Sequence, residues 1–103
     1  MKQPVLSEDA LDAALSAADG PRWELAGGKL VKTVVCTDFV GALVFVGAVG
    51  KLAEGMNHHP DIDIRYNRVT LALITHDSGG ITQLDVDLAR AVDAVDTGVR
   101  REP

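Results

Sequence analysis

Three histidines, His58, His59 and His76, are the only histidines of the chain, and they lie within a stretch of nineteen residues. Imidazole titrates near neutral pH, so a cluster of histidines can donate and accept protons under the conditions of a cell. Two of them are adjacent in sequence, and a hairpin could bring the third beside them. We therefore expect His58, His59 and His76 to be catalytic residues that transfer protons.

Metal binding is the rival use of such a cluster. Neighbouring residues of a strand point to opposite faces, so His58 and His59 would not easily share one ion. The chain has one cysteine, Cys36, and lacks a helical HxxxH pair that could complete a tetrahedral site. We expect no metal at these histidines.

The strands that position the histidines can be read from the alternation of apolar and polar residues between His59 and Thr75. Two such runs are separated by Asn67-Arg68, which predicts a tight hairpin. With Tyr66 opposite Val69, the apolar residues of both runs form one face, and a slip of one residue would destroy it. The same pairing places His59 opposite His76, with Cβ atoms about 5 Å apart.

The spacing of these residues resembles the signature of the pterin-4a-carbinolamine dehydratases, also called 4a-hydroxytetrahydrobiopterin dehydratases. That signature combines a charged residue, a His followed by His or Asn, a proline or small residue, an aromatic residue, a distant His or Trp, and an aspartate. This chain supplies Glu54, His58-His59-Pro60, Tyr66, His76 and Asp85. The likeness extends from Trp23 to about Val95. Many members carry an aromatic residue two positions after the proline, where this chain has Ile62.

The resemblance implies a hydro-lyase that removes water from 4a-hydroxytetrahydrobiopterin to give quinonoid dihydropterin. Such a reaction recycles the pterin after an aromatic amino acid hydroxylase has acted. Pterin would be the substrate, and no metal or redox cofactor would be needed. The resemblance also implies that His58, His59 and His76 line the pterin site, with His58 and His76 in acid–base transfer and His59 holding the substrate.

The two carboxylates of the signature have simpler alternatives. Glu54 could bind the pterin or a histidine, or it could be a solvated residue at a helix end. Asp85 could orient His76, or it could only cap a helix through a local backbone hydrogen bond. The whole protein also has an alternative function, because members of this family act as dimerisation or assembly partners of other proteins. Partner binding would survive loss of the histidines, whereas dehydration would not.

The composition of the 103 residues, 47 % hydrophobic and 24 % charged, is that of a globular protein, and we expect one domain spanning residues 1–103. The net charge of −5 argues against binding to nucleic acid or to an anionic membrane surface. A lone Cys36, expected to be a small apolar residue at a strand end, fits a reducing cytoplasm. We find no signal peptide and no run of about 20 apolar residues, so we expect a soluble cytoplasmic protein.

The first half of the chain predicts a helix and a hairpin. After a short tail to Leu6, Ser7 is a candidate N-cap, and Gly20-Pro21 would stop the helix. Arg22–Ala26 reads as a strand with Trp23 and Leu25 on one side, and Gly27-Gly28 forms the turn to a return strand over Lys29–Cys36. We expect Trp23 to be a core or interface aromatic residue rather than a group that stacks on substrate.

A second helix is predicted from a cap at Thr37 to about Glu54, with Gly55 as its left-handed end. Its expected buried face carries residues at helical spacing: Phe39, Leu43, Val46, Val49 and Ala53. Because this helix is apolar nearly all round, it needs burial on more than one side. We therefore expect subunit contacts, as in a homodimer or homotetramer.

The last helix starts with a capping-box pattern between Thr82 and Asp85. Its expected apolar face is Leu84, Leu88, Ala91, Val92 and Val95. The tail from Thr97 to Pro103 is expected to fray. The element order is therefore αββαββα, which predicts an α+β fold with a four-stranded antiparallel sheet and helices packed on one face.

Overall fold

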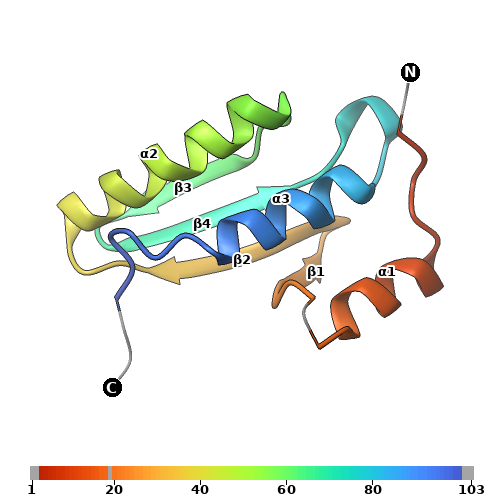
Figure 1. Ribbon diagram of the computed structural model, residues 1–103, viewed down its shortest axis with the longest axis horizontal. Helices are drawn as coiled ribbons and strands as arrows, with labels where there is room; N and C mark the ends of the chain where they lie inside the picture. The colour runs from red at the N-terminus through yellow and green to blue at the C-terminus, as the bar shows by residue number, and fades with distance from the viewer. Residues whose placement is uncertain (1–2, 19, 101–103) are drawn as a thin grey trace.

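The computed structural model describes residues 3–18 and 20–100 (Figure 1). Along the chain the elements are α1 (Glu8–Ser16), β1 (Glu24–Ala26), β2 (Lys29–Val35), α2 (Phe39–Met56), β3 (Asp61–Arg65), β4 (Arg68–Leu73), the 3₁₀ helix η1 (His76–Ser78) and α3 (Gln83–Asp93). This order confirms the predicted succession of helices and hairpins.

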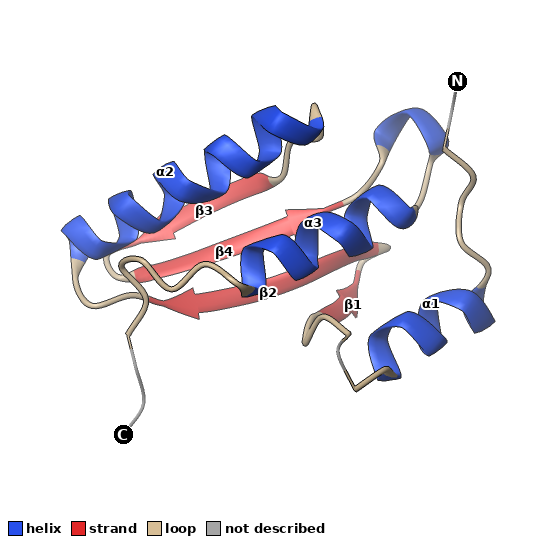
Figure 2. Ribbon diagram, viewed as in Figure 1, coloured by secondary structure: helices blue, strands red, loops and turns tan. Residues whose placement is uncertain are grey.

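The four strands form one antiparallel sheet in the order β1-β2-β4-β3. Figure 2 shows α2 and α3 side by side across one face of this sheet, with α1 beside β1. The side chains under the helices come from alternate positions of the two central strands, such as Leu30 and Val34 of β2 and Leu71 of β4, and all are buried. The predicted α+β fold with helices on one face is confirmed.

The N-termini of the helices are capped by side chains. Ser7 Oγ accepts a hydrogen bond from the backbone N–H of Ala10, as its position predicted. In α2 the cap is Asp38, whose carboxylate accepts from the N–H of Gly41 at 2.7 Å, so the prediction of Thr37 is wrong by one residue. The charged side chain of Asp38 suits this position at least as well as threonine does.

The C-terminus of α2 also differs from the prediction. The helix continues through Gly55 to Met56 and ends at Asn57, which adopts the left-handed conformation with φ of 49°. Asparagine tolerates this conformation better than most residues with a Cβ. The later ending matters for the site, because His58 follows Asn57 directly.

The buried face of α2 matches the predicted one only in part, because Val49 and Ala53 are buried as expected but Phe39 and Leu43 are not. Its buried residues are Gly41, Ala42, Phe45, Val49 and Ala53, whereas Phe39 and Leu43 are each 48 % exposed. A helix that is apolar all round has little preference between faces, so the pattern could not select the side that packs. By length and hydropathy alone α2 could cross a membrane, but here it lies along the sheet with Phe45 and Val49 in the core.

The first hairpin has the predicted turn, with Gly27 and Gly28 both at positive φ and Ala26 paired with Lys29. Its first strand is shorter than expected, because β1 begins at Glu24, and Leu25 is 53 % exposed. Trp23 is buried and belongs to the core, as predicted.

The second hairpin pairs Ile64 with Val69 and Ile62 with Leu71. The predicted register, with Tyr66 opposite Val69, is therefore wrong by two residues. Tyr66 takes the positive φ of the turn, 53°, and the turn is Tyr66-Asn67 rather than Asn67-Arg68. A slip of two residues leaves every side chain on its original face, so the apolar face survives the correction.

Both ends of the described chain are tied to the fold. The N–H of Leu6 donates to the carbonyl of Ile81 at 2.8 Å, and Val5 pairs with Thr82. At the other end, the N–H of Arg100 donates to the carbonyl of Val35. The predicted fraying of the tail is therefore wrong for residues 97–100, and residues 101–103 lie outside the described part.

The buried face of α3 also extends beyond the prediction. Leu88 and Val92 are buried as expected, but Asp85, Val86 and Ala89 are buried too. Leu84, Ala91 and Val95 are only partly buried. The burial of Asp85, the one acidic residue of this set, leads directly to the site.

Candidate active site

The three histidines line one pocket of about 190 Å³ at one end of the sheet. The left-handed turn at Asn57 directs the chain from α2 into His58 and His59, while His76 opens η1 shortly after β4 ends. Figure 1 shows the C-terminal end of α2 and the loop after β4 at this same end. The other residues of the lining are Asn57, Ile74, Thr75 and Asp77.

The histidines meet by a different route from the predicted one. The ladder between β3 and β4 ends at Asp61 opposite Ala72, so the expected cross-strand pair of His59 and His76 is not formed. The histidines instead come from the two segments that flank the hairpin.

His58 is the buried member of the cluster and is fixed by a carboxylate. Its Nε2 lies 2.6 Å from Oδ1 of Asp85, and Asp85 is fully buried. Asp85 therefore orients His58 and not His76, which corrects the expectation. The pairing connects residues 27 positions apart, so local sequence could not reveal it.

Asp85 combines this role with capping of α3. Its Oδ2 accepts hydrogen bonds from the N–H of Thr82 at 2.9 Å and from the hydroxyl of Thr75 at 2.8 Å. Both carboxylate oxygens are thus engaged, and three donors surround a charge that would otherwise be costly to bury. Asp85 thus caps α3 and also orients a histidine, which is His58 instead of the expected His76, because the start of α3 lies against His58.

The hydroxyls of Thr75 and Thr82 form a chain with one direction. The Thr75 hydroxyl uses its only proton toward Asp85, so the Thr82 hydroxyl, 2.7 Å away, must donate to Thr75. Thr82 Oγ1 then accepts from the N–H of Leu84. Sequence reasoning missed Thr75, although its position directly before His76, at the end of a strand, was an available signal.

Since the Asp85 carboxylate only accepts hydrogen bonds, Nε2 of His58 carries the proton of the neutral ring. The lone pair then lies on Nδ1, for which no group in residues 3–18 or 20–100 serves as a hydrogen-bond donor. The geometry therefore leaves one basic nitrogen of a fixed imidazole available beside the pocket.

The other two histidines are exposed. His59 Nε2 is hydrogen-bonded to Oε2 of Glu54. Of the roles considered for Glu54, contact with a histidine is therefore the one observed. The His59 side chain is 58 % exposed. Within residues 3–18 and 20–100, the side chain of His76 forms no hydrogen bond or ion pair, and it lines the same pocket. Across these ranges, no three ligating side chains gather closely enough to hold a metal ion.

Two residues of the signature region do not line this pocket. Tyr66 is 67 % exposed in the turn between β3 and β4, at the opposite end of the hairpin from the histidines. Ile62 lies in β3 and is 38 % exposed. The aromatic position of the signature therefore does not act within the histidine pocket of one chain.

Solved structures share this arrangement of sheet and helices. A transcriptional coactivator/pterin dehydratase from Brucella melitensis is 35 % identical, with a TM-score of 0.79 over 87 % of this chain and 96 % of that chain. A pterin dehydratase-like protein described as a RuBisCO assembly factor of the alpha-carboxysome shares the fold at 24 % identity, with a TM-score of 0.60 over 70 % of this chain and 86 % of that chain. The fold and its histidine pocket thus define a pterin dehydratase-like class.

Sequence comparisons define the family more narrowly. The family model described as "Pterin 4 alpha carbinolamine dehydratase" matches residues 4–95 of this chain. Proteins named "Putative pterin-4-alpha-carbinolamine dehydratase" are 48 % identical in Acidobacterium capsulatum, over 87 % of this chain and 96 % of theirs, and 52 % identical in Thermomicrobium roseum, over 81 % and 88 %. This chain belongs to the pterin-4-alpha-carbinolamine dehydratase family.

Proposed function

We propose that this protein dehydrates 4a-hydroxytetrahydrobiopterin to quinonoid dihydropterin by histidine acid–base catalysis. The observation that carries the proposal is one pocket lined by three imidazoles, of which His58 is buried and fixed by Asp85 at 2.6 Å. The family of the chain supplies the pterin class of substrate.

The reaction requires two proton transfers on neighbouring atoms of the substrate. The ring nitrogen N5 loses a proton, the electron pair of its N–H bond forms the C4a=N5 double bond, and the 4a-hydroxyl leaves as water after gaining a proton. A base and an acid on one pocket wall are sufficient for these steps. No electrons are exchanged with another molecule, so we propose that no metal or redox cofactor takes part.

We assign the base to His58, because its Nδ1 lone pair is available while Asp85 holds Nε2. Orientation by a carboxylate keeps the tautomer that this role needs. His76, exposed on the opposite segment of the lining, is the proposed acid for the leaving hydroxyl. His59, held by Glu54, is proposed to bind the substrate.

An aromatic amino acid hydroxylase is the proposed source of the carbinolamine, because such enzymes leave the pterin hydroxylated at C4a. The buried free thiol of Cys36 fits a reducing compartment, and we propose that the reaction takes place in the cytoplasm.

The test is a dehydration assay on freshly generated carbinolamine with the wild-type protein and His58→Ala. We expect acceleration over buffer for the wild type and a kcat lower by about 10²- to 10⁴-fold for His58→Ala, the usual contribution of general acid–base catalysis. A wild-type protein that does not accelerate the reaction would refute the proposal.

A second candidate function is favoured by the outer face of α2. Four large apolar side chains are exposed there, Phe39, Val40, Leu43 and Val44, with Val40 at 65 %. Exposed apolar clusters of this kind commonly mark protein interaction surfaces. We propose that copies of the chain associate through this face, as a homodimer or homotetramer, and that it is where a protein partner would bind.

Light scattering after gel filtration tests this association. Leu43→Glu should reduce the oligomer mass, whereas Leu25→Glu, at a similarly exposed leucine of β1, should not. Association that persists in Leu43→Glu would refute the interface. Loss of association without loss of dehydration would separate the two functions.

A further inference from the structure

A second cavity, of about 370 Å³, adjoins the histidine pocket. The two cavities share four lining residues: Asn57, His58, Thr75 and Asp77. His58 therefore lines both cavities, and a molecule bound against its ring lies beside both.

One wall of the second cavity includes Gln3, which belongs to the N-terminal segment 3–6. Gln3 lines it together with Ser78, and the Ser78 hydroxyl donates to the carbonyl of Gln3 at 2.5 Å. The segment is fixed to the loop before α3 by the hydrogen bond from Leu6 to Ile81. A Cβ added to Gly80 would meet Val5 at 3.0 Å, which shows how closely the segment and the loop pack.

The wall offers hydrogen bonds to a ligand. The Gln3 side chain has an amide donor and a carbonyl acceptor, and Ser78 Oγ, which uses its proton toward Gln3, retains lone pairs that can accept. Met56 and Leu84 supply the apolar part of the lining. This mixture suits a short chain that carries hydroxyl groups.

The size of the histidine pocket supports a second compartment. Ligand sites usually measure about 300–1,000 Å³, and the histidine pocket alone, at about 190 Å³, is smaller. It has room for a compact ring system but little more. With the adjoining cavity the site reaches the usual range.

The chemistry of the proposed reaction indicates what would occupy the second cavity. In a tetrahydropterin, C4a is bonded to N5 and N5 to C6, so the substituent on C6 begins three bonds from the reacting carbon. When C4a and N5 lie against His58, this substituent must lie close to His58 as well.

We propose that the second cavity binds the C6 substituent and that Gln3 and Ser78 make the site selective for pterins with a short, neutral, hydroxylated side chain. This inference rests on the proposed function. The exposed carboxylate of Asp77 in the shared lining, and the net charge of −5, disfavour an anionic substituent at this position.

The test compares two carbinolamines, one with a 1,2-dihydroxypropyl group at C6 and one with a methyl group. The quantity measured is the ratio of their kcat/KM values, because this ratio does not depend on the fraction of folded protein. We expect the wild type to prefer the dihydroxypropyl substrate. Gln3→Ala should reduce the preference about 3- to 10-fold, which corresponds to one neutral hydrogen bond.

The matched control is Gln83→Ala, which removes an exposed glutamine that lines neither cavity. It should leave the ratio unchanged. Ser78→Ala should reduce the ratio as Gln3→Ala does. Equal ratios for wild type, Gln3→Ala and Ser78→Ala would overturn the inference, as would a wild type that prefers the methyl substrate.

Direct binding separates this inference from the proposed function. Calorimetric titration with the stable 7,8-dihydropterins that carry the same two substituents needs no turnover. If the wild type dehydrates neither carbinolamine but binds the dihydroxypropyl compound more tightly, and Gln3→Ala removes the difference, the proposed function fails and the second cavity stands. If binding shows no difference between the two compounds, the inference fails.

Discussion

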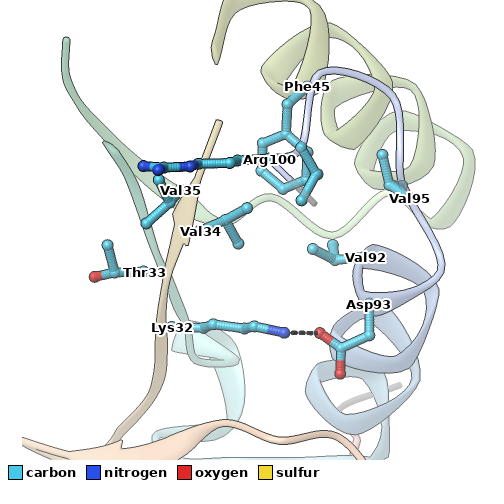
Figure 3. Close-up of a pocket in the computed structure, with 10 residues that line it drawn as sticks. Lys32, Thr33, Val34, Val35, Phe45, Val92, Asp93, Val95 and Arg100 are labelled. Atoms are coloured by element: carbon cyan, nitrogen blue, oxygen red, sulfur yellow. Dashed lines mark hydrogen bonds and ion pairs between the residues drawn. The ribbon is translucent and has the colours of Figure 1, made fainter. Parts of the chain in front are cut away.

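Two pockets lie toward opposite ends of the same central strands, and they differ in what their polar groups can still do. The histidine pocket follows the end of β4, near the start of β2. The other pocket, which we call the Lys32 pocket, is distinct from the second cavity beside His58. It lies toward the end of β2 and, at about 290 Å³, is larger than the histidine pocket (Figure 3). Its apolar part comes from residues such as Val34, Phe45 and Val92.

In the lining of the Lys32 pocket, the two charged side chains of Lys32 and Asp93 are paired with each other. Lys32 Nζ lies 2.7 Å from Oδ1 of Asp93, the contact drawn in Figure 3. The same carboxylate accepts from Trp23 Nε1 at 2.8 Å and from the N–H of Arg22. Asp93 thus fastens β2 and the segment before β1 to α3, and its interactions are structural.

Asp85 has the same number of donors, but one of them is an imidazole. The second nitrogen of His58 remains available to a ligand after the first is bound to Asp85. The comparison teaches that the volume of a pocket does not identify a reactive site. An unengaged acid–base group held by an engaged carboxylate does so better.

The sharpest test of this comparison replaces the two aspartates of α3 in the same way. Asp85→Asn replaces one of two acceptor oxygens with an amide N–H₂. Either Nε2 of His58 or the backbone N–H of Thr82 then loses its acceptor. We expect kcat to fall about 10²-fold and the free energy of unfolding to fall by about 1–3 kcal/mol. Steady-state dehydration kinetics and urea unfolding measure the two effects.

Asp93→Asn is the control. Its amide oxygen can still accept from Trp23, whereas the charge of the partly exposed pair with Lys32 and the long hydrogen bond from the N–H of Arg22 are lost, a change of about 1 kcal/mol. Its kcat should equal that of the wild type. Equal loss of activity in both variants would contradict the distinction between the two pockets.

The second prediction concerns the crossing of two glycines near the Lys32 pocket. Gly98 has φ of 79°, and a Cβ there would lie 2.2 Å from the carbonyl oxygen of Gly41. We expect Gly98→Ala to lower the free energy of unfolding by about 1–3 kcal/mol, because the backbone must move or remain strained. The activity per folded molecule should not change. Gly47→Ala, at an open position of the exposed helix face, is the control and should not destabilise.

Much of the fold could be predicted because its local signals agree. Gly27-Gly28, the Ser7 cap and the capping box of Thr82 and Asp85 each act through neighbouring residues, and all three appear where the sequence indicated. The histidine cluster was also predicted, although from a register that is wrong.

The errors have physical causes. Alternation repeats every two residues, so it cannot distinguish the observed hairpin register from one slipped by two. The face of α2 could not be chosen from a uniformly apolar pattern; close contact at Gly41 and the burial of Phe45 decided it. The bond between His58 and Asp85 depends on how α3 docks, which no local pattern specifies.

The third prediction breaks the hydroxyl chain behind His58. Thr75→Val keeps the shape of a buried side chain but removes the donor to Asp85 and the acceptor for Thr82. We expect a loss of about 1–2 kcal/mol in the free energy of unfolding, because a buried hydroxyl loses its partner. We also expect a smaller loss of kcat than in Asp85→Asn, since the bond to His58 remains. Thr33→Val, at an exposed threonine pair on the sheet, is the control.

The fourth prediction uses the buried thiol of Cys36, which lies at the end of β2 away from the histidines. Burial raises the pKa of the Cys36 thiol above its ordinary value. The folded state therefore holds this proton more tightly than the unfolded state does. The resulting stabilisation is complete below about pH 8.5, the ordinary value for a thiol, and is lost as the pH rises through the folded value.

Urea unfolding between pH 7.5 and pH 10 measures this effect in the wild type and in Cys36→Ala. Other groups titrate in this range in both proteins, so the difference between them isolates the thiol. We expect the stability of the wild type to fall more steeply with pH than that of Cys36→Ala. The pH profiles of kcat should be the same in both proteins, because Cys36 lies outside the histidine pocket. If the pH profile of kcat differed between the wild type and Cys36→Ala, the prediction would be wrong, and the two ends of the sheet would be coupled.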